Sequence, residues 1–176
     1  MGLLEGDNMK KIIFSVILIF IIGCFVFLSL SNQSSEAVVS FIDKKDIILK
    51  IDNSSPISDE LAIEKNGGEK FSIKSFYGST KYEIYVKQIN SLNSISADYI
   101  KLYLCEGSSN RPITDVLVFN DLKVSNSNMD SRRLYVGNIR KNEVIKFNLK
   151  MWLSDNYTIS NEKRNFEVVV GVRAIN

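Results

Sequence analysis

Histidine is absent from this sequence, and its absence removes much of the chemistry that side chains ordinarily perform. A Ser-His-Asp or Cys-His triad, a histidine-bound zinc site and the commonest general base are all excluded. Two cysteines are present, but Cys24 falls inside a long apolar run and Cys105 stands alone outside it, so the rest of the chain can form neither a disulfide nor a thiolate metal site. A catalytic or metal site would have to be built from carboxylates.

Four carboxylates stand close together in the sequence, at Asp52, Asp59, Glu60 and Glu64. They could supply the acid and base pair of a glycosidase or bind calcium through their oxygens, although their spacing is unlike that of an EF-hand loop. Carboxylates beside turns more commonly cap helices or lie in solvent. A surface hydrolase or metal-binding enzyme that uses carboxylates only is therefore the alternative function. The main expectation is a protein without a catalytic site, metal or cofactor.

A second group of residues suits contact instead of catalysis. Trp152 and its neighbour Lys150, and likewise Tyr99 and Tyr103, fall on strand faces opposite the apolar ones. If these faces are open to water they are candidate interaction surfaces, because exposed aromatics beside basic residues suit interfaces. The alternative is that a second sheet or a loop covers them. Cys105 could be a reactive or cross-linking thiol, or a small inert residue at a strand end.

The elements that must position these residues show the period-two alternation of half-buried antiparallel strands. No helical stripe competes, and clusters of Asn, Ser, Gly and Asp separate the alternating segments. We therefore predict an all-β fold, an antiparallel β-sandwich of the jelly-roll kind, in which residues 38–176 form one domain. Strands are expected at residues 38–42, 46–51, 71–76, 82–89, 98–105, 116–124 (irregular), 134–139, 144–153 and 165–175, with a polar loop at 126–133.

The alternation also predicts which side chains face the core. In the strand at 98–105, Ile100, Leu102 and Leu104 share the inward face. In the strand at 144–153, the inward face carries Ile145, Phe147, Leu149, Met151 and Leu153. The formal net charge of +2, with both signs intermixed, gives no electrostatic reason to expect nucleic acid as a partner.

The apolar run Ile12–Leu30 contains nineteen residues without a charge and follows Lys10 and Lys11. About 20 apolar residues cross the hydrocarbon layer as a helix, so this run predicts a transmembrane or signal segment with the lipid bilayer as its partner. The lysines before the run place residues 1–11 in the cytoplasm, and the chain after the linker 31–37 outside the cell. The protein is thus expected at the cell membrane as a single-pass protein, or secreted if the leader is cleaved.

Three alternatives remain open for the fate of this apolar run in the cell. Its length favours an uncleaved signal anchor, because signal-peptide apolar cores run about 7 to 15 residues. Small residues at Ser35 and Ala37 allow a cleaved signal, with cleavage after Ala37. The sequence before Cys24 resembles a lipobox, which would make that cysteine a lipidation site, although the apolar run continues past it. Residues 1–8 are interpreted as a start-site artefact, because Met9 followed by two lysines is the ordinary start of a bacterial signal.

Several stretches resemble small exported proteins of Gram-positive bacteria, distant relatives of the TasA and camelysin group. The resemblance covers residues 46–176, and its most specific piece is Leu149-Lys150-Met151-Trp152-Leu153-Ser154-Asp155. It implies a jelly-roll β-sandwich at the cell surface that assembles into biofilm-type fibres. The camelysin group has been classed with metallopeptidases, but this chain has no HExxH motif. We therefore expect a membrane-tethered or secreted structural or interaction protein, a biofilm-matrix or fibre-type subunit. It would meet its own copies, other envelope proteins or surface polymers through strand edges and exposed aromatics.

Overall fold

The computed structural model describes residues 38–42, 44, 47–53, 55–65, 67–89, 93–107, 109–125 and 128–175. The predicted cytoplasmic segment 1–11, the run Ile12–Leu30 and the linker 31–37, with Cys24 and Ala37, lie outside these residues. Ala37–Asn176 forms one compact unit, which is described here by itself. None of the helices within the described ranges is long and apolar enough to span a membrane.

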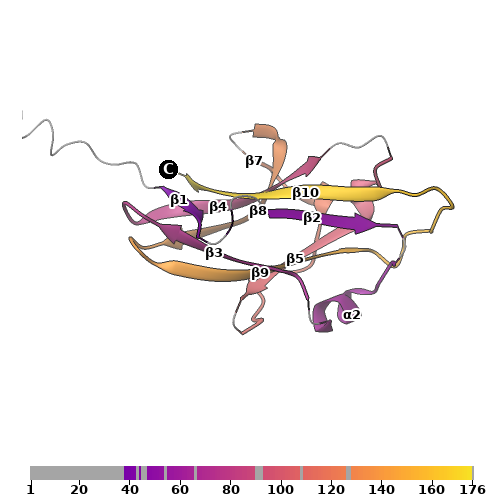
Figure 1. Ribbon diagram of the computed structural model, residues 1–176, viewed down its shortest axis with the longest axis horizontal. Coiled ribbons are helices and arrows are strands. Elements are labelled where there is room, and N and C mark those ends of the chain that lie inside the picture. The colour runs from indigo at the N-terminus through magenta and orange to yellow at the C-terminus, as the bar shows by residue number, and fades with distance from the viewer. Residues whose placement is uncertain are drawn as a thin grey trace, which may run out of the picture. The chain divides into compact units, whose positions relative to one another are not determined.

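Two five-stranded antiparallel sheets form the unit (Figure 1). The first sheet has the order β1 (Val39–Phe41), β3 (Glu69–Ser75), β9 (Val144–Leu153), β5 (Ile100–Glu106), β6 (Leu117–Val118). The second has the order β2 (Ile47–Asp52), β10 (Asn165–Ile175), β4 (Thr80–Ile89), β8 (Asn128–Ile139), β7 (Val124–Ser125). The helical turns are short: α2 (Asp59–Glu64), η1 (Ala97–Tyr99) and η2 (Phe119–Asp121). The predicted antiparallel two-sheet architecture is confirmed.

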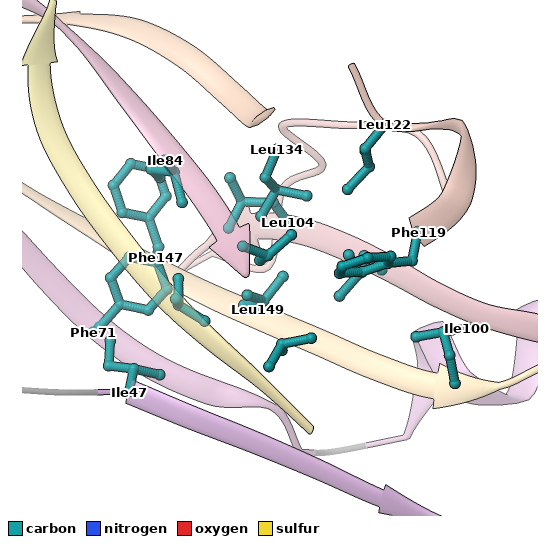
Figure 2. Packing of buried hydrophobic residues seen from close by; sticks show 14 of the residues in the cluster. Ile47, Phe71, Ile84, Ile100, Leu104, Phe119, Leu122, Leu134, Phe147 and Leu149 are labelled. Carbon is teal, nitrogen blue, oxygen red and sulfur yellow. The ribbon is translucent and has the colours of Figure 1, made fainter. Parts of the chain in front are cut away.

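The core lies between the sheets and is filled by the inward-facing residues of both (Figure 2). Phe147 of β9 stacks on Phe71 of β3 with ring centroids 5.3 Å apart, and its ring is 6.3 Å from that of Tyr82 in the second sheet. Ile84 and Leu149 have no exposed surface. Burial on this scale stabilises the fold by about 1.5–3 kcal/mol for each large side chain, which is what holds the two layers face to face.

The predicted bounds of β9 and β10 are confirmed, and so is the inward placement of Ile100, Leu102 and Leu104. Two expectations are wrong. The polar segment that was expected to be a loop up to residue 133 belongs largely to β8, which starts at Asn128 because its backbone pairs with β4 and β7. The segment 116–124, expected as one irregular strand, is instead β6, the turn η2 and the start of β7. The helix α2 was not predicted at all.

Replacing Phe147 with alanine should destabilise the sandwich by about 3–5 kcal/mol, because the deleted ring leaves a cavity between the two sheets. Val144→Ala on the same strand is the control, since Val144 is 45% exposed and its loss should cost much less. Denaturant unfolding followed by circular dichroism measures both free energies. Equal losses for the two variants would contradict the assignment of the core.

Candidate functional site

The segment that connects β2 to β3 covers part of the outer face of the first sheet and carries three of the four carboxylates that the sequence singled out, Asp59, Glu60 and Glu64. Its helix α2 begins after Ser58, whose hydroxyl accepts a hydrogen bond from Leu61 N (3.5 Å) in the usual manner of an N-cap. Before the helix, Ile57 N donates to Leu153 O (3.0 Å) and continues the pairing along the edge of β9. The segment is therefore attached to β9 through the backbone on its entry side.

Lys150 and Asn148 of β9 attach the exit side of the same segment. Lys150 is 8% exposed, and its ammonium donates to Ile63 O (2.6 Å) and Lys65 O (2.9 Å) at the C-terminal end of α2. A cation at this end satisfies carbonyls that have no partner within the helix. Asn148 Nδ2 donates to Gly67 O (3.1 Å). Gly68 follows with φ of 101°, and a Cβ there would lie 2.3 Å from Asn148 Oδ1, so only glycine fits this close approach.

Among the predicted carboxylates, Asp59 lies in the first turn of α2, and Asp52 lies at the end of β2 and lines a groove beside it. The oxygens of Asp59 accept two hydrogen bonds from Lys101 Nζ (2.7 and 2.9 Å), and Oδ1 also accepts one from Trp152 Nε1 (3.1 Å). Glu60 and Glu64 are exposed on α2. Within the described ranges, no three Asp, Glu or Cys side chains gather closely enough to hold a metal ion. Asp59 therefore orients Trp152 and Lys101 beneath α2.

Cys105 lies in a small apolar cluster under α2, together with Ala62, Tyr103 and Trp152. Its thiol has no exposed surface and donates to Asn148 O (3.4 Å). Burial raises the pKa of Cys105, and the positive charge of Lys150 lowers it only in part. Burial also raises the pKa of Tyr103. Because the thiolate is the nucleophile, this geometry favours the inert interpretation of Cys105.

Of the two interpretations offered for the faces that carry Trp152, Lys150 and Tyr103, these contacts favour the covered one. Trp152 is 6% exposed, Lys150 8% and Tyr103 6%, because the α2 segment lies over the outer face of the first sheet. These three side chains pack beneath the α2 segment and are not exposed to a partner. Tyr99 is different, since it is 37% exposed and its ring meets that of Tyr157 edge-on at 5.3 Å.

A groove of about 570 Å³ remains where the α2 segment meets the edges of β2 and β9. Its walls include Lys50 of β2, Ile57, and Met151 of β9. The ammonium of Lys150 faces the carbonyls of α2, so it is not available as a binding cation. The groove offers mixed polar and apolar walls and backbone at the edges of two strands, which suits contact with an extended chain better than catalysis.

A second polar cluster, on the outer face of the second sheet, was missed from the sequence. Glu83 of β4 has no exposed surface, and its Oε1 accepts from Arg133 Nε (2.8 Å) of β8. Its Oε2 accepts from Arg173 Nε (2.9 Å) of β10 and from Ser125 Oγ (3.1 Å) of β7. Arg173 also lies 4.9 Å from the ring centre of Tyr85. One buried carboxylate on β4 thus contacts side chains of β7, β8 and β10.

The charged residues of this cluster are visible in the sequence, but their pairing can be predicted only when the register of the strands is known. Glu83 stands at an outward position of an alternating strand, where solvent exposure is the ordinary expectation. It becomes an ion pair because Glu83 lies opposite Arg173 in the pairing of β4 with β10. Gly171, two residues earlier in β10, leaves room for the ring of Tyr85, because a Cβ there would lie 2.1 Å from the Tyr85 Cζ atom.

Replacing Lys150 with methionine should loosen α2 and speed the alkylation of Cys105 in a Cys24→Ser background. Loss of a charged hydrogen-bond donor to two carbonyls costs about 1.5–3 kcal/mol, so opening should be favoured roughly 10- to 100-fold. Lys150 lowers the pKa of Cys105, so its loss alone would slow alkylation, and faster labelling therefore reports opening. Lys146→Met, an exposed lysine on the same strand face, is the control. An unchanged labelling rate for K150M would contradict the capping role.

Replacing Glu83 with glutamine should destabilise the protein by roughly 3 kcal/mol, because two partly buried arginines lose their shared counter-charge. The matched control is Glu167→Gln, in the same sheet. Glu167 pairs with Lys50, whose side chain is 59% exposed, so its loss should cost less than about 1 kcal/mol. Urea unfolding of both variants measures the difference, and an E83Q loss as small as that of E167Q would show that the cluster adds little.

No family model matches the chain, and no curated protein is significantly similar to it.

Proposed function

We propose that this chain is an exported bacterial cell-surface protein whose β-sandwich acts by contact, as a structural or interaction domain. The run Ile12–Leu30 would hold it at the membrane, or deliver it outside if the leader is cleaved. The finer fold proposal is a jelly roll. Its support is the strand order, in which β2-β10-β4-β8 of one sheet stands against β3-β9-β5-β6 of the other, so that consecutive strands repeatedly change sheets.

The observation that carries this proposal is the open edge of β2. The strand ends the second sheet and pairs on one side with β10, while no described strand pairs with its other side. The edge strands β1, β6 and β7 have three, two and two residues, whereas β2 has six. Long edge strands offer backbone donors and acceptors to an incoming strand. Beside this edge, Ile48 is 58% exposed.

The side chains on and beside β2 would limit indiscriminate pairing at its edge and still allow a matching partner strand to bind. Lys50 pairs with Glu167 across the sheet, and charged residues on an edge strand limit indiscriminate pairing. The neighbouring Ile48 leaves an apolar side chain in solvent, which a partner strand could bury. A partner that lines up along residues 48–51 would gain backbone hydrogen bonds and this apolar contact together.

Self-assembly is the form of contact that the resemblance to the TasA and camelysin group favours. Subunits of the TasA type donate a free N-terminal strand to a neighbour, and a retained anchor at Ile12–Leu30 would prevent such donation. The open edge of β2 requires no processing, so it supports contact between copies in an anchored chain as well as in a released one. The alternative, a surface enzyme that uses carboxylates only, needs acidic oxygens in one cleft, whereas Asp59 is shared by Lys101 and Trp152.

The full chain, solubilised in detergent, should associate in a concentration-dependent manner, and Ile48→Lys should suppress that association about tenfold or more, because an added charge on an edge strand opposes pairing. Ile159→Lys is the matched control, since Ile159 is also 58% exposed but lies in the loop between β9 and β10. Sedimentation velocity measures the association constants. A wild-type chain that stays monomeric and binds no envelope polymer, or an I48K variant that associates like the wild type, would count against the proposal.

A further inference from the structure

One end of the sandwich brings together the start of the described chain and two turns. The backbone oxygen of Val38 accepts a hydrogen bond from Phe76 N (3.0 Å), so the chain enters the sandwich beside the turn from β3 to β4. Asn142 N donates to Ser75 O (2.8 Å), which joins the turn from β8 to β9 to the same end. Figure 1 shows β1, these two turns and the end of β10 together.

Exposed apolar side chains gather at this end. Phe76 is 39% exposed, Tyr77 57% and Val38 45%. Two consecutive aromatics at the tip of a turn serve no part of the core. Tyrosine rings such as that of Tyr77 are enriched where a membrane meets water, and the apolar ring of Phe76 can enter the lipid beside it. The Lys74 ammonium lies 5.3 Å from the ring centre of Phe76, so a cation accompanies the rings.

The charge at this end is positive. Among the described residues, Lys74, Lys81, Arg140 and Lys141 stand there with one acidic residue, Glu143, for a net charge of +3. The opposite end, made of residues 93–99 and 154–164, carries three acidic and two basic residues, for a net charge of −1. An anionic lipid surface attracts the first end and not the second.

In the proposed anchored form, the length of the chain before Val38 would keep the same end close to the bilayer. Residues 31–37 between the apolar run and Val38 number seven, and a fully extended chain of that length spans at most about 25 Å. β9 has ten residues and so carries the opposite end roughly 33 Å further away. This step rests on the proposed function, in which Ile12–Leu30 stays in the membrane.

We propose that this membrane-facing end, defined by Val38, Phe76, Tyr77, Lys81, Arg140 and Lys141, docks on the headgroup region of the lipid bilayer. Phe76 and Tyr77 enter the interface, and the basic side chains lie against anionic headgroups. The anchor thus holds the sandwich in one orientation, with its strands pointing away from the membrane and α2 at the outer end.

Tryptophan scanning tests the orientation in the full chain, reconstituted into vesicles of phosphatidylglycerol and phosphatidylcholine with brominated acyl chains. Tyr77→Trp places the probe at the membrane-facing end, and Ile159→Trp places it at the opposite end with a similar exposure, 57% against 58%. The signal of the parent chain, whose Trp152 is 6% exposed, is subtracted from both. We expect Trp emission at position 77 to shift to the blue and to be lost to bromine quenching, and emission at position 159 to be unaffected.

The outcomes separate this inference from the proposed function. Flotation of the chain with the vesicles reports the anchor, independently of the probe. A chain that fails to float overturns the anchored form of the proposed function and the docking with it. A chain that floats but shows equal quenching at both positions, or none at position 77, overturns only the docking. Arg140→Gln with Lys141→Gln should reduce the quenching at position 77 in anionic vesicles and leave it unchanged in vesicles of phosphatidylcholine alone.

Discussion

The structure depends on the burial of β9 from both sides. Its inward residues, such as Phe147 and Leu149, fill the core between the sheets, and its outward residues include Asn148, Lys150 and Trp152, none of which is more than 8% exposed. Polar groups can be buried only if their hydrogen bonds are made within the protein. The α2 segment makes most of them, since it offers carbonyls to Lys150 and to Asn148 Nδ2 and a carboxylate to Trp152. Among the described residues, Asn148 Oδ1 is the buried side-chain atom that is left without a partner. The position of α2, and of the groove beside it, follows from that requirement.

The second sheet meets the same requirement with side chains of its own strands. Glu83 is buried on its outer face by the side chains around it, and Arg133 and Arg173 supply the charge that it needs. Burying an ion pair gains little net stability, but leaving one partner alone is costly, so the cluster constrains which strands lie side by side. On both outer faces, some of the polar residues therefore make their contacts within the protein. This explains why side chains that the sequence suggested as contacts for a partner make contacts within the protein instead.

Alternation was enough to predict the two-sheet architecture, because β9, β10 and the inward face of β5 follow it without interruption. It failed where another constraint decided the conformation. The six residues of α2 are too few to show a helical stripe, and their helix depends on the Ser58 cap and on Lys150. The first half of β8 is polar, and Arg133 points to a carboxylate fifty positions earlier in the chain. The burial of Trp152 and the pairing of Glu83 likewise require long-range contacts that no local pattern records.

The open edge and the membrane-facing end are compatible because the register separates them along β10. That strand pairs with β4 as far as Ile175 opposite Lys81, at the end where Val38 enters. It pairs with β2 only from Val170 opposite Ile47 to Asn165 opposite Asp52, in the half that runs toward α2. A sandwich that docks by its basic end would therefore keep the edge of β2 clear of the headgroups. Anchoring and strand pairing then cooperate, since a fixed orientation presents the same edge on every copy and reduces the orientational freedom that pairing between copies has to remove.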